Sequence, residues 1–383
     1  MRNGNLVVAS LSKLGSATLG LAVSGLAVSG LLVSACTDTT TATTVRNLDR
    51  PSEIAFACFG DLAIDGVATT SAQPLSSCAA HLSGMPPAGQ EAIIAPNYFA
   101  FVLQPAEGTV AVLNIASVGI QDNDLFTPGL NDIPVGTLPV GMAEDRTGCF
   151  AITANSGSCD LAAIDMTSAL TLSEVAQVNR VGITTPAGEP LLARPRSITG
   201  GPQTDLIGEA CPAVPEGLLY IAYPDCNLVA VVDAGTGETQ SGLAFRDTGV
   251  IEAATDEDFA ACPVQCSNGS LILAHGTEPE TIEEKPVAVE VSPDGLSLYV
   301  TSETSPFFTI VELDADGLPT ANVRRIRVSP DSEGNEVGLR NFAVSDRIDM
   351  GGNLFNSVVQ PVGEFQFVYA IATDSTIRVI DIE

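Results

Sequence analysis

Side chains that could form a nucleophile with its base are scarce in this chain. It has 383 residues, no tryptophan and only two histidines, His81 and His275, each in a turn-like setting. The chain has no Gly-x-Ser-x-Gly motif, and two histidines leave few ways to build a serine–histidine–carboxylate site or a zinc site. We therefore expect both histidines to lie in exposed loops, and we predict no catalytic residues.

Carboxylates are the only polar side chains with possible chemistry that gather in clusters along the sequence. Asp and Glu outnumber Lys and Arg 46 to 16, and the net charge of −30 argues against a nucleic-acid partner, whose phosphates would be repelled. Four acidic clusters could offer oxygen ligands to Ca²⁺, at 121–124, 255–258, 278–284 and 314–317. Asp314-Ala-Asp316-Gly317 opens like a calcium loop, but Arg325 stands near the place of the expected Glu, and a β-turn explains the same residues. Calcium is thus the one cofactor that the sequence leaves open.

The first 35 residues have the character of an export signal. Arg2 and Lys13 accompany a long run of Leu, Ala, Val, Gly and Ser without acidic residues. The run ends in LVSAC at 32–36, which resembles the lipobox of bacterial lipoproteins. That resemblance implies cleavage before Cys36, lipid on Cys36 and, with Thr37 next, sorting to the outer membrane, on its periplasmic side or at the cell surface. A membrane-spanning anchor is the alternative.

The mature chain would then begin with a tether. Residues 36–49 comprise the lipidated Cys36 and a Thr-rich segment, and residues 50–383 form the folded domain. The expected contact with the membrane is through the lipid on Cys36.

Eight cysteines remain after Cys36, and an even number in an exported chain predicts disulfides. They are Cys58, Cys78, Cys149, Cys159, Cys211, Cys226, Cys262 and Cys266. Sequence order favours the local pairs Cys58–Cys78, Cys149–Cys159, Cys211–Cys226 and Cys262–Cys266, although eight cysteines allow many other pairings. Among these local pairs, the cysteines at 149 and 159 flank an expected hairpin and form the favoured pair. The spacing of Cys262 and Cys266 could also be half of a metal site, but no second cluster of Cys or His accompanies it.

The stretch Lys285–Gly317 predicts three antiparallel strands separated by Pro-, Asp- and Gly-containing turns. The pattern recurs four times, each copy with an aromatic residue in its middle strand. These aromatic residues are Tyr98, Phe150, Tyr220, Tyr299 and Tyr369. Third strands tend to end in Asp, at Asp165, Asp233, Asp314 and Asp381. The copies are farther apart than the roughly 40–50 residues of a bare propeller blade, so the excess should project as loops.

The middle strands resemble the YVTN-type β-propeller repeat family, through LYVT at 298–301, LYIA at 219–222 and VYAI at 368–371. Ser302 departs from the Asn of that family. The resemblance implies an all-β fold, a β-propeller of antiparallel blades. Five copies are visible, and degenerate copies inside 251–274 and 324–349 would make six or seven. An incomplete or truncated ring, and a pair of β-sandwiches, are the alternatives.

Three classes of function fit these features. The favoured one is a non-catalytic, lipid-anchored platform at the cell envelope that binds a protein or a polysaccharide. The second is a lactonase-like or other hydrolase with a site in the central channel, since propellers of this resemblance include such enzymes. A quinone-dependent redox propeller is disfavoured by the absence of tryptophan and of a haem-attachment motif. Three insertions should present the loops most exposed to a partner: Gly60–Gln90, Gly200–Pro215 and Ser241–Glu284.

Overall fold

The computed structural model describes most of the chain beyond residue 47. The described residues are 48, 50–64, 67–73, 94–115, 119–171, 175–202, 211–246, 249–267, 270–271, 284–345, 348–349 and 364–382. Chain contacts divide the protein into two units, Met1–Arg46 and Asn47–Glu383, and every described residue belongs to the second. The predicted signal, Cys36, Cys78, His81 and His275 lie outside the described residues. No helix within the described ranges is long and apolar enough to cross a membrane.

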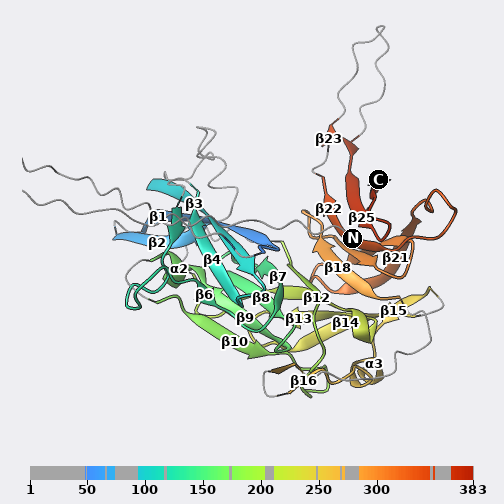
Figure 1. Ribbon diagram of the computed structural model, residues 1–383, viewed down its shortest axis with the longest axis horizontal. Coiled ribbons are helices and arrows are strands. Elements are labelled where there is room, and N and C mark those ends of the chain that lie inside the picture. Colours follow the sequence, from blue (N-terminus) through green and yellow to red (C-terminus); the bar gives the residue numbers. More distant parts are fainter. Residues whose placement is uncertain are drawn as a thin grey trace, which may run out of the picture. The chain divides into compact units, whose positions relative to one another are not determined.

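Within its described residues, the second unit is a β-propeller of five antiparallel blades that follow one another in chain order (Figure 1). Blade 1 contains β2 (Val67–Gln73), β1 (Ile54–Ile64), β3 (Ile94–Gln104), β4 (Thr109–Asn114) and β5 (Gly119–Gln121), with β6 (Ile133–Pro134) paired to β4. Blade 2 contains β7 (Pro139–Glu144), β8 (Phe150–Asn155), β9 (Asp160–Asp165) and β10 (Val178–Gly182). Blade 3 contains β11 (Ser197–Gly200), β12 (Leu218–Tyr223), β13 (Leu228–Asp233), β14 (Thr239–Phe245) and β15 (Ile251–Ala253).

The last two blades complete the set. Blade 4 contains β18 (Pro286–Val291), β19 (Ser297–Ser302), β20 (Phe307–Leu313) and β21 (Pro319–Arg327). Blade 5 contains β22 (Leu339–Val344), β25 (Phe367–Ala372) and β26 (Ile377–Asp381). Two short strands between β22 and β25 in the chain, β23 (Ile348–Asp349) and β24 (Glu364–Phe365), pair with each other. All five aromatic residues that mark the sequence copies lie in the expected middle strands, so the all-β and propeller predictions are confirmed.

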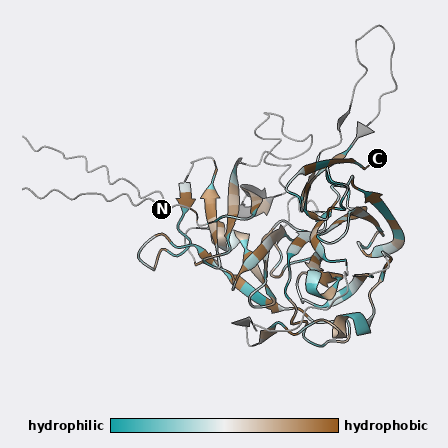
Figure 2. Ribbon diagram, turned by 45° about the vertical axis from the view of Figure 1, so that its right-hand side comes forward, coloured by the Kyte–Doolittle hydropathy of each residue, from teal (hydrophilic) through white to brown (hydrophobic). Residues whose placement is uncertain are grey.

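The inner strands of neighbouring blades contact one another: β1 contacts β7, β7 contacts β11, β11 contacts β18, and β18 contacts β22. Blades 2 to 4 therefore each have two faces to bury, and their middle strands must be apolar on both. In β12, Leu219, Ile221 and Tyr223 pack with blade 2, while Tyr220 and Ala222 pack with blade 4. Figure 2 shows hydrophobic residues concentrated in the strands. This double burial explains why the middle strands are continuous apolar runs.

The interface between blades 4 and 5 is built on aromatic rings. Phe308 of β20 is fully buried, and its ring centroid lies 5.3 Å from that of Phe342 in β22 and 5.7 Å from that of Tyr299 in β19. The opposite face of blade 5 carries exposed apolar side chains, among them Ile377 and Val379 at 68% and 61% exposure. Blade 5 thus buries one of its two faces against blade 4.

The aspartates that end the third strands have a local role in forming the turns that follow. Asp165 caps the helix α2 (Met166–Leu170) by accepting from the backbone N–H of Thr167. Asp233 and Asp314 each accept backbone N–H groups from residues two to four positions later. Such side-chain-to-backbone bonds stabilise tight turns. The Asp at the start of the suggested calcium loop therefore serves its own β-turn.

Two expectations about the insertions are corrected by the fold. Within the described residues, 251–274 forms no blade: it supplies β15, the helix α3 (Asp256–Ala260) and the small hairpin of β16 (Cys266–Ser267) and β17 (Ser270–Leu271). Residues 324–349 supply the end of β21 and the start of blade 5. In addition, part of the first expected loop is a hairpin, because β1 continues to Ile64 and pairs with β2.

Disulfides are present as predicted, but three of the four favoured local pairs, Cys149–Cys159, Cys211–Cys226 and Cys262–Cys266, are wrong. The fourth local pair, Cys58–Cys78, stays a prediction because Cys78 lies outside the described residues. The bonds are Cys149–Cys211, Cys159–Cys266 and Cys226–Cys262, with Cα separations of 5.8, 6.0 and 4.8 Å. Cys58 is also in a disulfide, whose partner lies outside the described residues. The favoured Cys149–Cys159 pair fails because these cysteines lie at opposite ends of β8. The first two bonds join blade 2 to segments that flank the strands of blade 3.

Tyr220 links blade 3 to a turn of blade 4, because its hydroxyl donates a 2.6 Å hydrogen bond to the carbonyl oxygen of Gly317. Burial, with a smaller contribution from the charge of Asp314, raises the pKa of Tyr220 to about 12. We expect Tyr220→Phe to lower the free energy of unfolding by about 1 kcal/mol, the usual net value of one such bond. Urea denaturation of both proteins measures this. An unchanged midpoint would show that the bond contributes nothing to stability.

Candidate functional site

A cavity of about 320 Å³ opens at the end of the propeller where the inner strands begin. We call it the mouth and define it by its ten lining residues: Val140, Ser156, Arg194, Pro195, Arg196, Pro224, Asp225, Lys285, Val287 and Glu303. They come from three consecutive blades, 2 to 4. The volume is at the lower end of the range typical of small-molecule sites.

The basic residues of the mouth are positioned by proline at the start of the inner strands. Arg194 and Arg196 flank Pro195, just before β11, and Lys285 precedes Pro286, the first residue of β18. Proline lacks an N–H and is favoured at the first position of a strand. The basic residues beside these prolines therefore lie at the beginning of the inner strands, where the backbone N–H of Arg196 donates to the carbonyl oxygen of Ala222 and the carbonyl oxygen of Lys285 accepts from Glu303.

A clamped segment, Cys262–Cys266, borders the mouth. Its two end residues are bonded to turns of blades 3 and 2, to Cys226 and Cys159 respectively. Between them, Gln265 donates from Nε2 to a carboxylate oxygen of Asp225 at 2.7 Å and accepts from the backbone N–H of Arg194 at 2.9 Å. One glutamine thus bridges two mouth residues, and two disulfides hold the segment that carries it.

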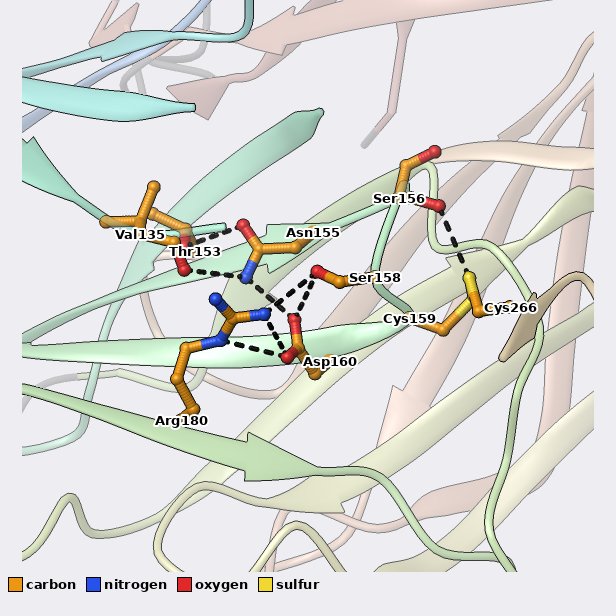
Figure 3. A network of polar contacts seen from close by, with 9 residues as sticks. All are labelled: Val135, Thr153, Asn155, Ser156, Ser158, Cys159, Asp160, Arg180 and Cys266. Atoms are coloured by element: carbon orange, nitrogen blue, oxygen red, sulfur yellow. Dashed lines mark hydrogen bonds and ion pairs between the residues drawn. A yellow bond between two sulfur atoms is a disulfide. The ribbon is translucent and has the colours of Figure 1, made fainter. Parts of the chain in front are cut away.

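The turn that carries Ser156 is fixed by the polar network in Figure 3. Asp160 accepts from Ser158 Oγ at 2.7 Å and from Asn155 Nδ2 at 3.0 Å, and it forms an ion pair with Arg180. Ser156 in turn accepts a 3.2 Å hydrogen bond from Nε of Arg194. The guanidinium of Arg194 is therefore hydrogen-bonded to a turn whose conformation is fixed by its own hydrogen bonds.

The mouth differs in charge from the rest of the chain. Six other arginines of the described residues form ion pairs: Arg180, Arg246, Arg325, Arg327, Arg340 and Arg378. In that same part of the chain, Arg194, Arg196 and Lys285 form none. The carboxylates of the mouth, by contrast, have partners: Asp225 bonds Gln265, and Glu303 lies 3.3 Å from Nε of Arg340. Cationic groups are thus in excess at this opening of a protein with net charge −30.

Glu53, just before β1, is a half-buried acid that interacts with the charge of Arg196. Its Oε2 accepts from the backbone N–H of Met142 at 2.7 Å. Burial raises the pKa of Glu53 to about 7, although the Met142 hydrogen bond and the charge of Arg196 oppose the shift. Burial likewise raises the pKa of Glu290 in β18 to about 7. Both carboxyls become charged near neutral pH rather than near 4.5.

The raised pKa of Glu53 predicts a pH-dependent stability. Between about pH 4.5 and 7 the folded state holds the proton that the unfolded state has lost, so the free energy of unfolding falls as pH rises through this window. We expect Glu53→Gln to match the wild type at pH 4.5 and to be about 2 kcal/mol more stable at pH 8. Denaturation curves across this range test it. Parallel curves for the two proteins would show that Glu53 titrates normally.

The acidic clusters singled out in the sequence mostly serve their own loops. Asp122 and Asp124 accept backbone N–H groups within the loop 122–131. Asp258 forms the capping box of α3 with Thr255 and pairs with Arg246. Of the cluster at 278–284, only Glu284 is described, and it pairs with Arg325. Among the described residues, no group of three His, Cys, Asp or Glu side chains is placed to hold a metal.

The sequence did not identify the mouth, although a signal was present. A basic residue adjoins the proline that begins three of the copies, at Arg50-Pro51, Arg194-Pro195 and Lys285-Pro286. Lys285 is also the only lysine after Lys13. The end of the expected insertion Ser241–Glu284 does border the site, through the clamped segment. The described residues of the other two expected insertions supply no lining residue of the mouth.

No family model and no curated protein matches this chain. Among solved structures, it is similar to hydrazine synthase of Kuenenia stuttgartiensis, with TM-score 0.37, 15% identity and coverage of 74% of this chain and 62% of that one. It is also similar to the β-propeller domain of Cps50 (Swd1) from Myceliophteria thermophila, with TM-score 0.35, 12% identity and coverage of 74% and 82%. A third is an auxiliary nutrient binding protein of Bacteroides thetaiotaomicron, with TM-score 0.33, 8% identity and coverage of 73% and 53%. Likenesses at this level say nothing about function.

Proposed function

We propose that this protein is an exported, non-catalytic binding protein of the bacterial cell envelope, anchored by lipid on Cys36, and that the mouth is its binding site. The observation that carries the proposal is the construction of the mouth: its cationic side chains have no ion-pair partner among the described residues, and two disulfides hold its rim. A rigid, preorganised rim loses little conformational entropy when a ligand binds. The disulfides are also consistent with an oxidising compartment outside the cytoplasm.

A binding experiment tests the site. Detergent-solubilised protein is titrated calorimetrically with envelope oligosaccharides and small organic acids, and the titrations are repeated with Val140→Trp, which fills the mouth. Val175→Trp is the matched control, because Val175 is an exposed residue outside the mouth. We expect saturable binding to the wild type and to the control, and none to Val140→Trp. Binding that is equal in all three proteins would overturn the assignment of the site.

The proposed lipid anchor at Cys36 can be tested separately. Intact-mass spectrometry of protein extracted from membranes should show a chain that begins at Cys36 and carries lipid. A Cys36→Ser protein should appear without lipid, with its signal uncleaved. A wild-type mass without lipid would contradict the anchor while leaving the binding site to be judged separately.

A second candidate function is a lactonase-like hydrolase, and one observation favours it. The pKa of Glu53 is raised to about 7, where a carboxylate is an effective general base, and Glu53 interacts with Arg196 of the mouth. Hydrolysis of a panel of lactones in a pH-stat separates the two functions. Turnover by the wild type that is lost in Glu53→Gln would establish the enzyme and contradict the non-catalytic proposal.

A further inference from the structure

We propose that the mouth recognises a small organic anion through its carboxylate, with Arg196 and Lys285 as the groups that bind the charge. The inference rests on the proposed binding function and names the class of ligand. It begins with an imbalance: within the described residues, these two side chains belong to no ion pair and make no hydrogen bond, whereas Arg194 is held by Ser156. Cations that lack partners at a concave site are the usual means of binding a carboxylate.

The internal carboxylate that interacts with Arg196, that of Glu53, has a hydrogen-bond partner of its own. Glu53 interacts with Arg196, but its Oε2 is hydrogen-bonded to the backbone of Met142, and burial raises its pKa to about 7. Burial thus favours the uncharged form of Glu53 and weakens its compensation of the positive charge of Arg196. A ligand carboxylate can supply the missing negative charge.

The acidic residues of the mouth favour a ligand that also carries donors. Asp225 and Glu303 line the same cavity, and each already has one fixed partner, Gln265 and Arg340. A carboxylate has acceptor capacity for more than one donor. Hydroxyl groups of a ligand can therefore bond these oxygens while its carboxylate lies at the basic residues. A hydroxylated acid, such as a sugar acid, has this combination.

Size and overall charge argue against a polymer as the bound species. The cavity of about 320 Å³ suits one small molecule. A polyanion would also meet repulsion from the rest of a protein whose net charge is −30. A small acid carries only one or two charges, so it gains the local attraction of the mouth at little long-range cost. Such an acid could be free or could end a longer neutral glycan, and the two share the chemistry tested below.

Lys285 offers a direct probe in the unmodified protein, since it is the only lysine after Lys13. An amine-reactive ester is applied to the protein in detergent, and peptide mass spectrometry follows acylation of Lys285 with time. The probes are galacturonate and galactose, which differ by a carboxylate in place of a hydroxymethyl group, together with malate and inorganic phosphate. We expect galacturonate or malate to slow acylation several-fold and galactose to have no effect. No protection by either acid would overturn the proposal, and protection by phosphate alone would overturn the carboxylate assignment.

Variants confirm the contacts. In calorimetric titrations with the protecting acid, Arg196→Gln and Lys285→Gln should each weaken binding about tenfold, the loss of one charge-assisted hydrogen bond. Arg327→Gln is the matched control, because Arg327 is an exposed arginine of β21 paired with Glu336. A glycan that ends in the acid is then compared with the free acid, and equal affinities would assign the recognition to the acid residue alone.

The outcomes separate this inference from the function on which it rests. If galactose and galacturonate bind equally, and Val140→Trp abolishes both, the mouth is a binding site and the anion assignment is wrong. If an acid binds but neither Lys285→Gln nor Val140→Trp changes its affinity, both proposals fail at this site.

Discussion

Replacing Cys159 and Cys266 together with alanine is expected to lower the free energy of unfolding by about 4 kcal/mol. The bond joins residues 107 positions apart. The other two disulfides shorten the loop that it closes in the unfolded chain to about thirty residues, for which loop-closure entropy gives a value of this size. Guanidinium denaturation under non-reducing conditions measures the change, and a loss below about 1 kcal/mol would contradict the entropic account.

The same substitution should also weaken ligand binding. Cys266 adjoins Gln265, the residue that bridges Asp225 and the backbone of Arg194. Without the bond, the clamped segment keeps one disulfide, through Cys262, and its hydrogen bonds. The control is the double replacement of Cys149 and Cys211, which removes a bond at the other end of β8. We expect a comparable loss of stability in the control with unchanged affinity at the mouth.

Asp145→Ala is expected to have an effect of similar size, a loss of about 4 kcal/mol in the free energy of unfolding. The carboxylate of Asp145 is buried and accepts four hydrogen bonds. The donors are the hydroxyl of Thr147 at 2.7 Å and the backbone N–H groups of Cys149, Phe150 and Glu216 at 3.1, 3.0 and 3.0 Å. Alanine removes all four of these hydrogen bonds, and each costs on the order of 1 kcal/mol or more where its donor is buried.

Two further variants calibrate the result for Asp145. Asp145→Asn keeps one acceptor oxygen and should recover part of the loss. Asp233→Ala removes a carboxylate that also accepts backbone N–H groups, but it does so in an exposed turn where water can replace it. We expect a loss of about 1 kcal/mol there. Equal losses at the two positions would show that burial is not the cause.

The blades could be predicted because their signal is local. A middle strand that is buried on both faces must be an apolar run, as in β12 and β19, and the turn after the third strand needs a residue such as Asp233 or Asp314. Both features lie within a few residues of one another along the chain. The five copies found in the sequence are accordingly the five blades.

The cysteine pairing could not be predicted from the same signal. Cys149 and Cys159 are close in sequence, but a six-residue strand, β8, separates them in space. Their true partners stand in segments that flank the strands of the next blade, because the two blades pack face to face. Which cysteine meets which is decided by packing between blades, and the periodicity of a strand carries no information on it.

The mouth was missed for a related reason. Arg196, Asp225 and Lys285 precede or follow strands of two different blades, and they are separated by up to 89 positions in the chain. Each alone is an ordinary polar residue beside a turn. Their combined charge becomes visible only when the inner strands are arranged around one centre.

The arrangement of the disulfides also bears on resistance to proteases. The bonds Cys149–Cys211, Cys159–Cys266 and Cys226–Cys262 overlap, so every peptide bond between residues 149 and 266 is spanned by at least one of them. A single cut anywhere in this stretch leaves two fragments that remain covalently joined. On a non-reducing gel the nicked protein would run as one species, and it would separate into two only after reduction. In a compartment rich in peptidases, one peptide bond in a loop of blade 2 or 3 can therefore be cleaved without separating the protein into two molecules.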